Sequence, residues 1–136
     1  MTRYLLDTNI CIYIRQKRPQ AVLKRFEKLT VGDAAISAIT YGELVYGAER
    51  SPAMHREAYR KLLAELVEFL PVLPMPKDAG DAYGTLRESL ERNGQVIGNN
   101  DLWIAAHAKA EGLTLVTNDE REFKRVHGLK TENWAN

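Results

Sequence analysis

Four carboxylates in this chain stand where an apolar stretch gives way to a turn or to a helix start: Asp7, Glu43, Asp101 and Asp119. In α/β proteins, residues at the carboxyl ends of parallel strands gather at one edge of the sheet, where ligands bind. Four acids brought together there, without an equal number of bases, would repel one another strongly. Such a cluster is tolerated mainly when a divalent cation lies within it. The pattern therefore predicts a metal-dependent enzyme.

Helix capping offers a local explanation for the same acids. Asp7 fits a turn after a strand, and Asp101 fits an N-cap or a first-turn acid favoured by the helix dipole. Thr40 to Glu43 matches the capping box, in which the glutamate returns to bond the amide of the cap residue. Thr117 to Glu120 matches the box again, around Asp119. Singly, each acid fits capping as well as catalysis, whereas their common position at one end of the expected elements favours a shared site.

Expected strands and helices alternate along the whole chain, which predicts an α/β domain with a parallel sheet covered on both faces. The strands are expected at Arg3–Leu6, Ala34–Ile39, Val72–Leu73, Thr114–Thr117 and Leu129–Thr131. Helices are expected after an N-cap at Thr8, from Pro19, and over Thr40–Glu49, Met54–Leu70, Lys77–Asn93, Asp101–Glu111 and Glu120–Arg125. The prolines around the third strand confine it to an edge, because proline cannot donate to a central ladder.

The composition is that of an ordinary globular domain, with 136 residues of which 45% are hydrophobic and 27% charged. No apolar run approaches the length of a membrane span, which excludes an integral membrane protein. Asp7 and Asn9 interrupt the apolar N-terminus and no small-residue cleavage site follows, so we expect no signal peptide. The single cysteine, Cys11, can form no internal disulfide, which fits a reducing cytoplasm.

The net charge of +1 does not mark the chain as a nucleic-acid binder, but its bases are unevenly distributed. Six of them crowd one early stretch: Arg15, Lys17, Arg18, Lys24, Arg25 and Lys28. These side chains fit an ordinary solvated helix face. They also fit a basic rim that would guide a phosphate backbone toward an acidic pocket.

Other chemistries find less support in the residues. None of the three histidines, His55, His107 and His127, pairs with a recognisable nucleophile, which argues against a Ser–His or Cys–His site. The chain has neither a G-x-G-x-x-G motif nor a P-loop, which argues against dinucleotide and nucleoside triphosphate binding. The run from Asp7 to Asn9 lacks the second aspartate of an aspartyl-phosphate phosphatase, which disfavours a signalling domain that accepts a phosphoryl group.

Three segments, in order and spacing, resemble the PIN-domain ribonucleases, and specifically the VapC-type toxins of bacterial toxin–antitoxin pairs. The segments are LLDTNICIYI, ISAITYGELVYGAERS and IGNNDLWIAAHAKAEGLTLVTNDEREFKRVHGLKTENW. The resemblance covers essentially the whole chain. It implies a single PIN domain over residues 1–136, with a short central parallel sheet of four to five strands flanked by helices on both faces.

The resemblance also implies a site. The residues that match the acidic quartet of the family are Asp7, Glu43, Asp101 and Asp119. Asn9 matches the polar residue that supports the first aspartate, and Thr117 matches the small hydroxyl residue two positions before the last acid. At that last position some relatives carry asparagine. Asn99 and Asn100 stand at positions that vary among relatives, so we assign them no catalytic role.

The chemistry implied by the quartet is hydrolysis of an RNA phosphodiester by water that a divalent cation has made more acidic. Oxygen ligands suit Mg²⁺, with Mn²⁺ as a substitute. Asp7 and Asp101 are expected to be the principal ligands. Glu43 and Asp119 would bind a second ion or hold metal-bound water, and one of them would orient the attacking water.

By the same resemblance we expect a cytoplasmic toxin that cleaves transfer RNA or ribosomal RNA and so inhibits translation. Its partner would be a VapB-type antitoxin that covers the acidic groove, in a toxin–antitoxin hetero-oligomer built on a toxin homodimer. Operator DNA would be bound only through the antitoxin. Two alternatives remain open: a PIN-type nuclease of RNA maturation, and a PIN-like protein that binds RNA without cleaving it.

Overall fold

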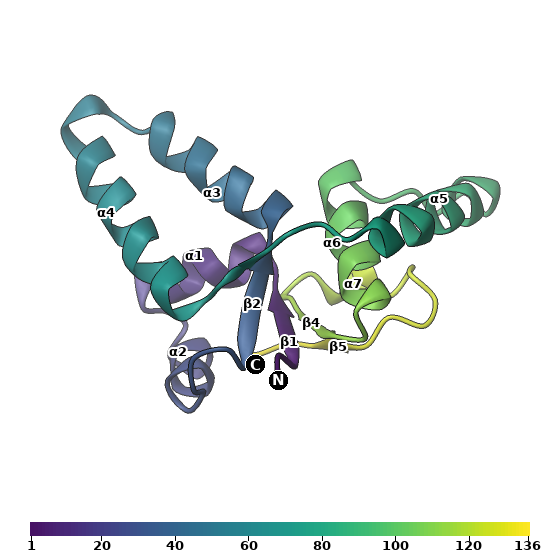
Figure 1. The fold of residues 1–136 in the computed structure, drawn as a ribbon, viewed down its shortest axis with the longest axis horizontal. Coiled ribbons are helices and arrows are strands. Elements are labelled where there is room, and N and C mark those ends of the chain that lie inside the picture. The colour runs from purple at the N-terminus through teal and green to yellow at the C-terminus, as the bar shows by residue number, and fades with distance from the viewer.

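The computed structural model describes residues 1–136 and places five short strands in one sheet at the centre of the molecule (Figure 1). The strands are β1 (Tyr4–Leu6), β2 (Ala34–Ser37), β3 (Val72–Leu73), β4 (Thr114–Val116) and β5 (Thr131–Glu132). They lie in the order β3-β2-β1-β4-β5, and every neighbouring pair is parallel. The first strand is therefore the central one, and β3 lies at an edge, as its prolines predicted.

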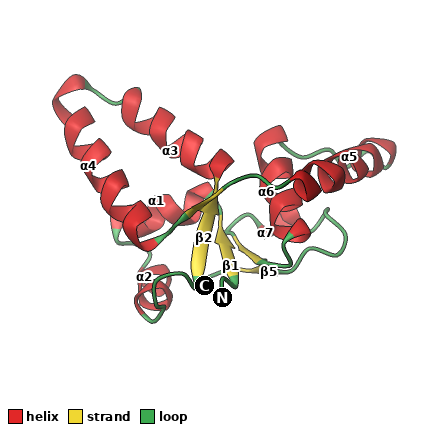
Figure 2. Ribbon diagram, viewed as in Figure 1, coloured by secondary structure: helices red, strands yellow, loops and turns green.

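Seven helices cover the sheet, four from the first half of the chain and three from the second (Figure 2). The first group is α1 (Thr8–Gln16), α2 (Gln20–Glu27), α3 (Ala38–Glu49) and α4 (Ala53–Phe69). The second group is α5 (Lys77–Arg92), α6 (Asn99–Ala110) and α7 (Glu120–Phe123). This architecture confirms the predicted α/β class, and the expected element bounds agree with the structure to within two residues.

Successive side chains of β1 point to opposite faces of the sheet, and the core is accordingly divided into two layers. Leu5 and Leu6 are fully buried neighbours whose side chains point to opposite faces of the sheet. Leu5 joins a cluster of 13 buried residues that includes Leu115 of β4 and the alanine-rich side of α6. Leu6 joins a cluster of 11 that includes Val116 and side chains of α1, α2 and α3, and partly buried side chains of α4 pack against it. Each helix group thus packs on its own face of the sheet.

The start of α1 differs from the expectation. Asp7 is the N-cap, and its Oδ1 accepts a hydrogen bond from the backbone N of Ile10 at 2.9 Å. The prediction that Thr8 caps this helix is therefore wrong. The carboxylate already stands at the end of the central strand, so it reaches the free amides before the threonine does.

The start of α3 also differs. β2 ends at Ser37 rather than at Ile39, and the Ser37 hydroxyl accepts from the backbone N of Thr40 at 3.0 Å. Thr40 lies inside the helix and is fully buried, so the predicted capping box from Thr40 to Glu43 is wrong. Ser37 and Thr40 are both good cap residues, and burial of the strand end selects the first. The Glu43 side chain is consequently available for other contacts.

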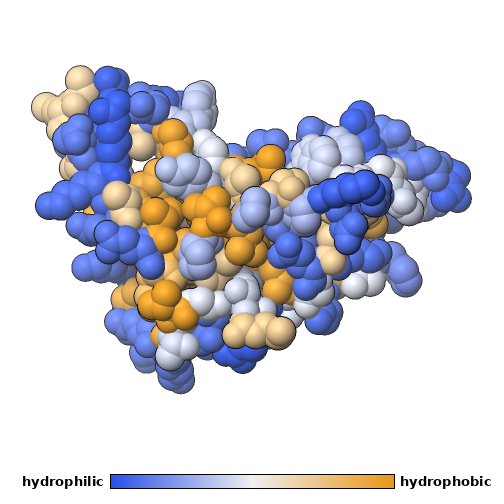
Figure 3. Space-filling view, in the orientation of Figure 1, coloured by the Kyte–Doolittle hydropathy of each residue, from blue (hydrophilic) through white to orange (hydrophobic).

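Two arms rise beyond the carboxyl ends of the strands. One is the hairpin of α3 and α4, and the other is formed by α5 and α6 (Figure 1). The space-filling view shows the molecule hollowed between these arms, with apolar side chains gathered over the centre of the same face (Figure 3). None of the helices is both long enough and apolar enough to span a membrane.

Candidate active site

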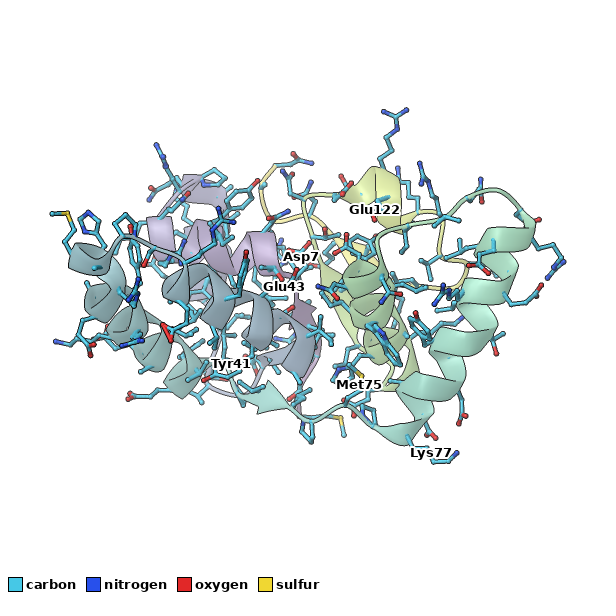
Figure 4. All side chains as sticks on the ribbon, turned by 90° about the horizontal axis from the view of Figure 1, so that it is seen from above. Asp7, Tyr41, Glu43, Met75, Lys77 and Glu122 are labelled. Atoms are coloured by element: carbon cyan, nitrogen blue, oxygen red, sulfur yellow. The ribbon has the colours of Figure 1, made fainter.

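The acids predicted from the sequence meet at the carboxyl edge of the sheet. Asp7 follows β1, Glu43 lies in α3 behind β2, Asp101 lies in the first turn of α6, and Asp119 caps α7 behind β4. Seen from above, Asp7 and Glu43 lie together between α3 and α6, with Glu122 of α7 across from them (Figure 4). The charges of Glu43 and Asp119 act on Asp7, and the charges of all three act on Asp101, which places the four acids in one electrostatic cluster.

Asp7 is the most buried member of the cluster, with 4% of its surface exposed. Burial, opposed by hydrogen bonds from Thr117 and from the amide of Ile10, raises the pKa of Asp7 from its ordinary 3.8 to about 6. Repulsion from Asp119 and Glu43 contributes to this rise. Asp7 therefore carries its negative charge at a cost that a nearby cation would relieve.

Thr117 links the first and the last acid of the quartet. Its side chain hydrogen-bonds Asp7, and its Oγ1 also accepts from the backbone N of Asp119 at 2.9 Å. Asp119 is the N-cap of α7, and its Oδ1 accepts from the backbone N of Glu122 at 3.3 Å. The predicted capping box from Thr117 to Glu120 is therefore wrong, because the cap lies two residues later. Thr117 is fully buried between the two acids.

Glu43 is held by two polar side chains from other helices. Thr8 Oγ1 donates to Glu43 Oε1 at 2.5 Å, and Asn100 Nδ2 donates to Glu43 Oε2 at 3.4 Å. Both oxygens thus point into the space between α1, α3 and α6 rather than back along α3. Thr8 and Asn100, which sequence reasoning did not assign to the site, orient this carboxylate. Thr8 is the residue that the sequence predicted as the cap of α1.

Asp101 enters the cluster from α6, whose N-cap is Gly98, so it is a first-turn acid and not an N-cap. Burial raises the pKa of Asp101, a hydrogen bond with Glu122 lowers it, and the charges of the other three acids raise it. A Cβ atom added to Gly98 would lie 3.5 Å from Asp101 Oδ2 and 3.7 Å from Glu122 Oε1. Both distances are ordinary van der Waals contacts, so Gly98 lies directly against the two carboxylates.

Glu122 is a fifth acid at the site, and sequence reasoning missed it. Its Oε1 accepts from the backbone N of Gly98 at 2.9 Å, which ties α7 to the start of α6. Burial, a hydrogen bond with Asp119 and the charge of Asp101 together raise the pKa of Glu122 to about 7, although the hydrogen bond from Gly98 lowers it. The sequence did contain a signal, because Asp119 and Glu122 have the spacing of a capping box. Thr117 and Glu120 have the same spacing, and the sequence alone does not distinguish the two pairs.

Two predicted contributors are not at the cluster. Asn9 is exposed, and Asp7 takes its hydrogen bonds from Ile10 and Thr117, so the structure does not show the expected support by Asn9. α2 lies at the level of the amino ends of the strands, away from the acids (Figure 1). There Arg25 pairs with Glu132 at 2.9 Å and lies over the ring of Trp134. The predicted basic rim is therefore wrong for α2.

The donor chemistry of the cluster fits a hard divalent cation, since every candidate ligand is a carboxylate oxygen. No three acidic, histidine or cysteine side chains close on one point as a complete cage would. An ion here would keep several waters or gain oxygen ligands from a phosphate, which is the usual way in which proteins hold Mg²⁺. Asp7 and Asp101 are the two acids of the quartet whose pKa values are raised, and a cation near them would offset the repulsion that contributes to this.

Comparison with known proteins gives the chain its relatives. The PIN-domain family model matches residues 4–129. Ribonuclease VapC2 of Haemophilus influenzae is 44% identical over 99% of this chain and 100% of the relative. The protein named tRNA(fMet)-specific endonuclease VapC of Shigella flexneri is 41% identical, with coverage of 99% of this chain and 100% of that protein.

Solved structures agree with the sequence relatives. A VapBC complex of Salmonella typhimurium bound to DNA contains a chain with a TM-score of 0.91 and 38% identity, covering 98% of this chain and 99% of that one. VapBC2 of Rickettsia felis, bound to a DNA fragment from its promoter, gives a TM-score of 0.88 and 40% identity at the same coverage. The length of these matches and the shared fold show that the chain belongs to the PIN-domain family and, within it, to the VapC ribonucleases.

Proposed function

We propose that this protein is the toxin of a type II toxin–antitoxin pair and that it cleaves RNA with the acid cluster at the carboxyl edge of its sheet. The observation that carries the proposal is the buried Asp7 carboxylate, which meets the charges of Glu43 and Asp119 directly behind the central strand. A site that concentrates carboxylates in this way suits an oxygen-bound cation and the phosphate that it binds.

In this proposal Asp7 and Asp101 hold the cation. Once bound, the ion lowers the pKa of a water molecule and offsets charge that develops on the phosphate. Glu43, fixed by Thr8 and Asn100, faces the same space and accepts a proton from the attacking water. The hydrogen bonds that orient Glu43 matter because a general base must keep its oxygen within hydrogen-bond reach of that water.

Asp119 and Glu122 act from the other side of the cluster. Glu122 bonds the amide of Gly98 and contacts Asp101, so it sets the side chain of Asp101 rather than reaching the substrate. Asp119 caps α7 with Oδ1, its side chain also contacts that of Glu122, and its charge acts on Asp7. Glu122 is therefore a positioning residue and Asp119 a candidate for holding metal-bound water.

For the cation we propose Mg²⁺, with Mn²⁺ as a substitute, because both accept an all-oxygen ligand set. For the substrate we propose transfer RNA, the target named for the Shigella flexneri relative. Cleavage of a transfer RNA would inhibit translation, which gives the proposed toxin its effect on growth. The buried free thiol of Cys11 is consistent with the reducing cytoplasm in which translation takes place.

We also propose a VapB-type antitoxin as partner, because similar chains occur in VapBC complexes. An apolar groove fits part of such a partner. Its cavity of about 230 Å³ lies between α1, α2, α3 and α4 and is lined by nine hydrophobic residues, among them Tyr59, Leu62 and Leu66. No residue of α4 is buried, although the helix carries this apolar row. An amphipathic antitoxin helix would bury the row, with Arg15 and Lys17 at the rim for its acidic side chains.

The substitution Asp7→Asn tests the metal site with two readouts. We expect the loss of transfer RNA cleavage to exceed about a hundredfold, since a principal cation ligand is removed. We also expect Mg²⁺ to raise the melting temperature of the wild type but not that of the variant, because only the wild type binds the ion at this site. An equal thermal shift in both proteins, or cleavage by the variant in excess chelator, would contradict the assignment.

The same variant should be more stable than the wild type in chelator at neutral pH. The raised pKa of Asp7 means that the native state holds the proton more tightly than the unfolded chain. Wild-type stability therefore falls as pH rises from about 4 through about 6, and Asp7→Asn avoids up to about 3 kcal/mol of this loss at pH 7. The difference should disappear near pH 4.

Urea denaturation at the two pH values measures this effect. Asp33→Asn is the opposite control, because hydrogen bonds from Thr30 hold the pKa of Asp33 below its ordinary value. That substitution should lower stability at pH 7. Finding Asp7→Asn less stable than the wild type at pH 7 would show that the Asp7 charge is already compensated.

Glu122→Gln tests the fifth acid. Glutamine retains an oxygen that can accept from Gly98, so the fold should persist while the charge beside Asp101 is lost. We expect the Mg²⁺ concentration for half-maximal cleavage to rise about 10- to 100-fold, the usual cost of removing a group that supports a metal ligand. Glu120→Gln is the matched control, since Glu120 bonds Asn133 instead. An unchanged Mg²⁺ requirement in Glu122→Gln would leave Glu122 with a structural role only.

Leu62→Lys tests the antitoxin groove. Leu62 lines the cavity and is 42% exposed, so lysine should be accommodated in the free toxin. We expect calorimetry to show antitoxin affinity reduced by about tenfold or more, as for an apolar anchor at an interface centre. RNA cleavage by the free protein should be unchanged. Met54→Lys, at an exposed residue outside the groove, should bind antitoxin normally, and equal affinity in the two variants would place the antitoxin elsewhere.

A further inference from the structure

The face of α3 that carries Glu43 also carries two residues without a structural task. Ile39, Glu43, Tyr46 and Arg50 follow one another at spacings of four, three and four residues, which places them in a row on one side of a helix. Tyr46 is 64% exposed, and Arg50 is exposed at the end of the helix. The row therefore runs from the acid cluster outward along the α3–α4 arm.

Tyr46 shares a cavity with the proposed active site. Thr8, Gly42, Glu43, Tyr46 and Asn100 are among the residues that line this cavity of about 600 Å³. Within it, Glu43 is bonded by Thr8 and Asn100. Glu43 is the one acid of the cluster that lines this cavity, so the tyrosine stands next to the proposed site on the side of Glu43.

The surroundings of Tyr46 leave room for a flat ligand. Gly42 and Gly47 flank it on the helix, and a Cβ atom added to either glycine would meet no atom within 4 Å. The Arg50 guanidinium lies over the tyrosine ring, 5.6 Å from its centroid, and so covers one face. With 64% of the residue exposed, the remaining ring surface is open.

Arg50 brings a positive charge that no acid neutralises. It takes part in no ion pair, and its neighbour Glu49 is bonded instead by Arg60 at 2.7 Å. A free guanidinium beside an open aromatic ring is the combination that binds single-stranded nucleic acid, in which the base stacks and the phosphate contacts the arginine. The arginine also balances the negative charge of the acid cluster for an approaching polyanion.

Resting on the proposed ribonuclease function, we propose that Tyr46 stacks on a base next to the scissile phosphate and that Arg50 contacts the RNA backbone beyond it. The spacing of Glu43, Tyr46 and Arg50 along α3 matches the spacing of nucleotides in a stacked strand. Tyr46 lies three residues along α3 from Glu43, a rise of about 4.5 Å, and Arg50 lies about 10 Å along. One nucleotide of stacked strand advances by about 3.4 Å, so the row spans the first two or three nucleotides beside the cleavage site.

The kinetics of Tyr46→Ala on an initiator transfer RNA transcript test the proposal. We expect KM to rise about tenfold or more, within the range found for loss of one base–aromatic stack, and kcat to stay within about twofold of the wild type. Tyr46→Phe retains the ring and should retain KM. Tyr41→Ala is the matched control, because Tyr41 is an exposed tyrosine of α3 outside the cavity and on another side of the helix (Figure 4).

Arg50→Gln separates the backbone contact from the stack. Its KM should rise at low salt, and the difference from the wild type should shrink as salt increases, since a contact with one phosphate is lost. Arg92→Gln, at an exposed arginine that pairs with Glu88 at the end of α5, should leave KM unchanged. An Arg50→Gln effect that does not depend on salt would refute the phosphate contact.

Transcripts with a single abasic nucleotide identify the stacked base. If Tyr46 stacks there, the abasic site and Tyr46→Ala should each raise KM, and their combination should raise it no further than either alone. Additive effects at every position flanking the cleavage site would overturn the proposal. A normal KM in Tyr46→Ala would also overturn the proposal. So would a molar mass of Tyr46→Ala, measured by light scattering, that differs from that of the wild type, because this would assign Tyr46 to an interface between copies of the chain.

The outcome for the proposed function is separate. If wild-type protein fails to cleave any transfer RNA in Mg²⁺, the ribonuclease assignment to this substrate class fails, and the stacking proposal fails with it. If the wild type cleaves, Asp7→Asn does not, and Tyr46→Ala behaves as the wild type does, the ribonuclease assignment stands and only the stacking proposal is refuted.

Discussion

The mutual repulsion of carboxylates fixed at one edge of a sheet is the constraint on which the rest of this structure depends. Asp7 cannot move away from its neighbours, because it follows the central strand directly and caps α1 in the same position. Thr117 binds it to the start of the segment that carries Asp119. Burial raises the pKa of Asp7, and the adjacent acids raise it further. The core of the molecule therefore holds charges together that would separate in a flexible chain, and a cation is the natural counterpart of that arrangement.

Capping and catalysis had been treated as competing explanations of the acids, and the structure shows that they are compatible. Asp7 and Asp119 each use Oδ1 to accept from a backbone amide at the start of a helix. Thr117 also hydrogen-bonds the Asp7 side chain, and Glu122 also hydrogen-bonds that of Asp119. A carboxylate has about four lone-pair sites, so it can accept such bonds and still contact water or a metal. The cap also fixes the side chain torsions, so the carboxylate is positioned at no further entropic cost. Local sequence patterns cannot separate the two roles, because one residue can perform both.

The strands, the helices and the four acids of the quartet could be predicted because they depend on hydrophobic periodicity and on motifs that are local in sequence. The predictions failed where tertiary contacts decide between local equivalents. Ser37 and Thr40 are both suitable caps, and only the burial of the strand end selects Ser37. Glu122 belongs to the site because α7 lies against the start of α6, a contact between residues 24 positions apart. Thr8 and Asn100 hold Glu43 for the same reason, since they reach it from other helices.

The two helix groups meet across the site with little to join them. The only hydrogen bond between α3 and α6 joins Asn100 to Glu43, at 3.4 Å. A ligand can therefore enter between the arms without breaking a network. Asp7 and Asp119 follow the strands β1 and β4, and Glu43 and Asp101 lie near the starts of helices at the carboxyl edge of the sheet. The outer residues of α3, by contrast, are exposed and support no core packing. Residues such as Tyr46 and Arg50 can therefore change at little cost to stability while the acids stay in place. If Tyr46 and Arg50 contact RNA as proposed, substitutions there would change which RNA is recognised and leave the cleavage chemistry in place.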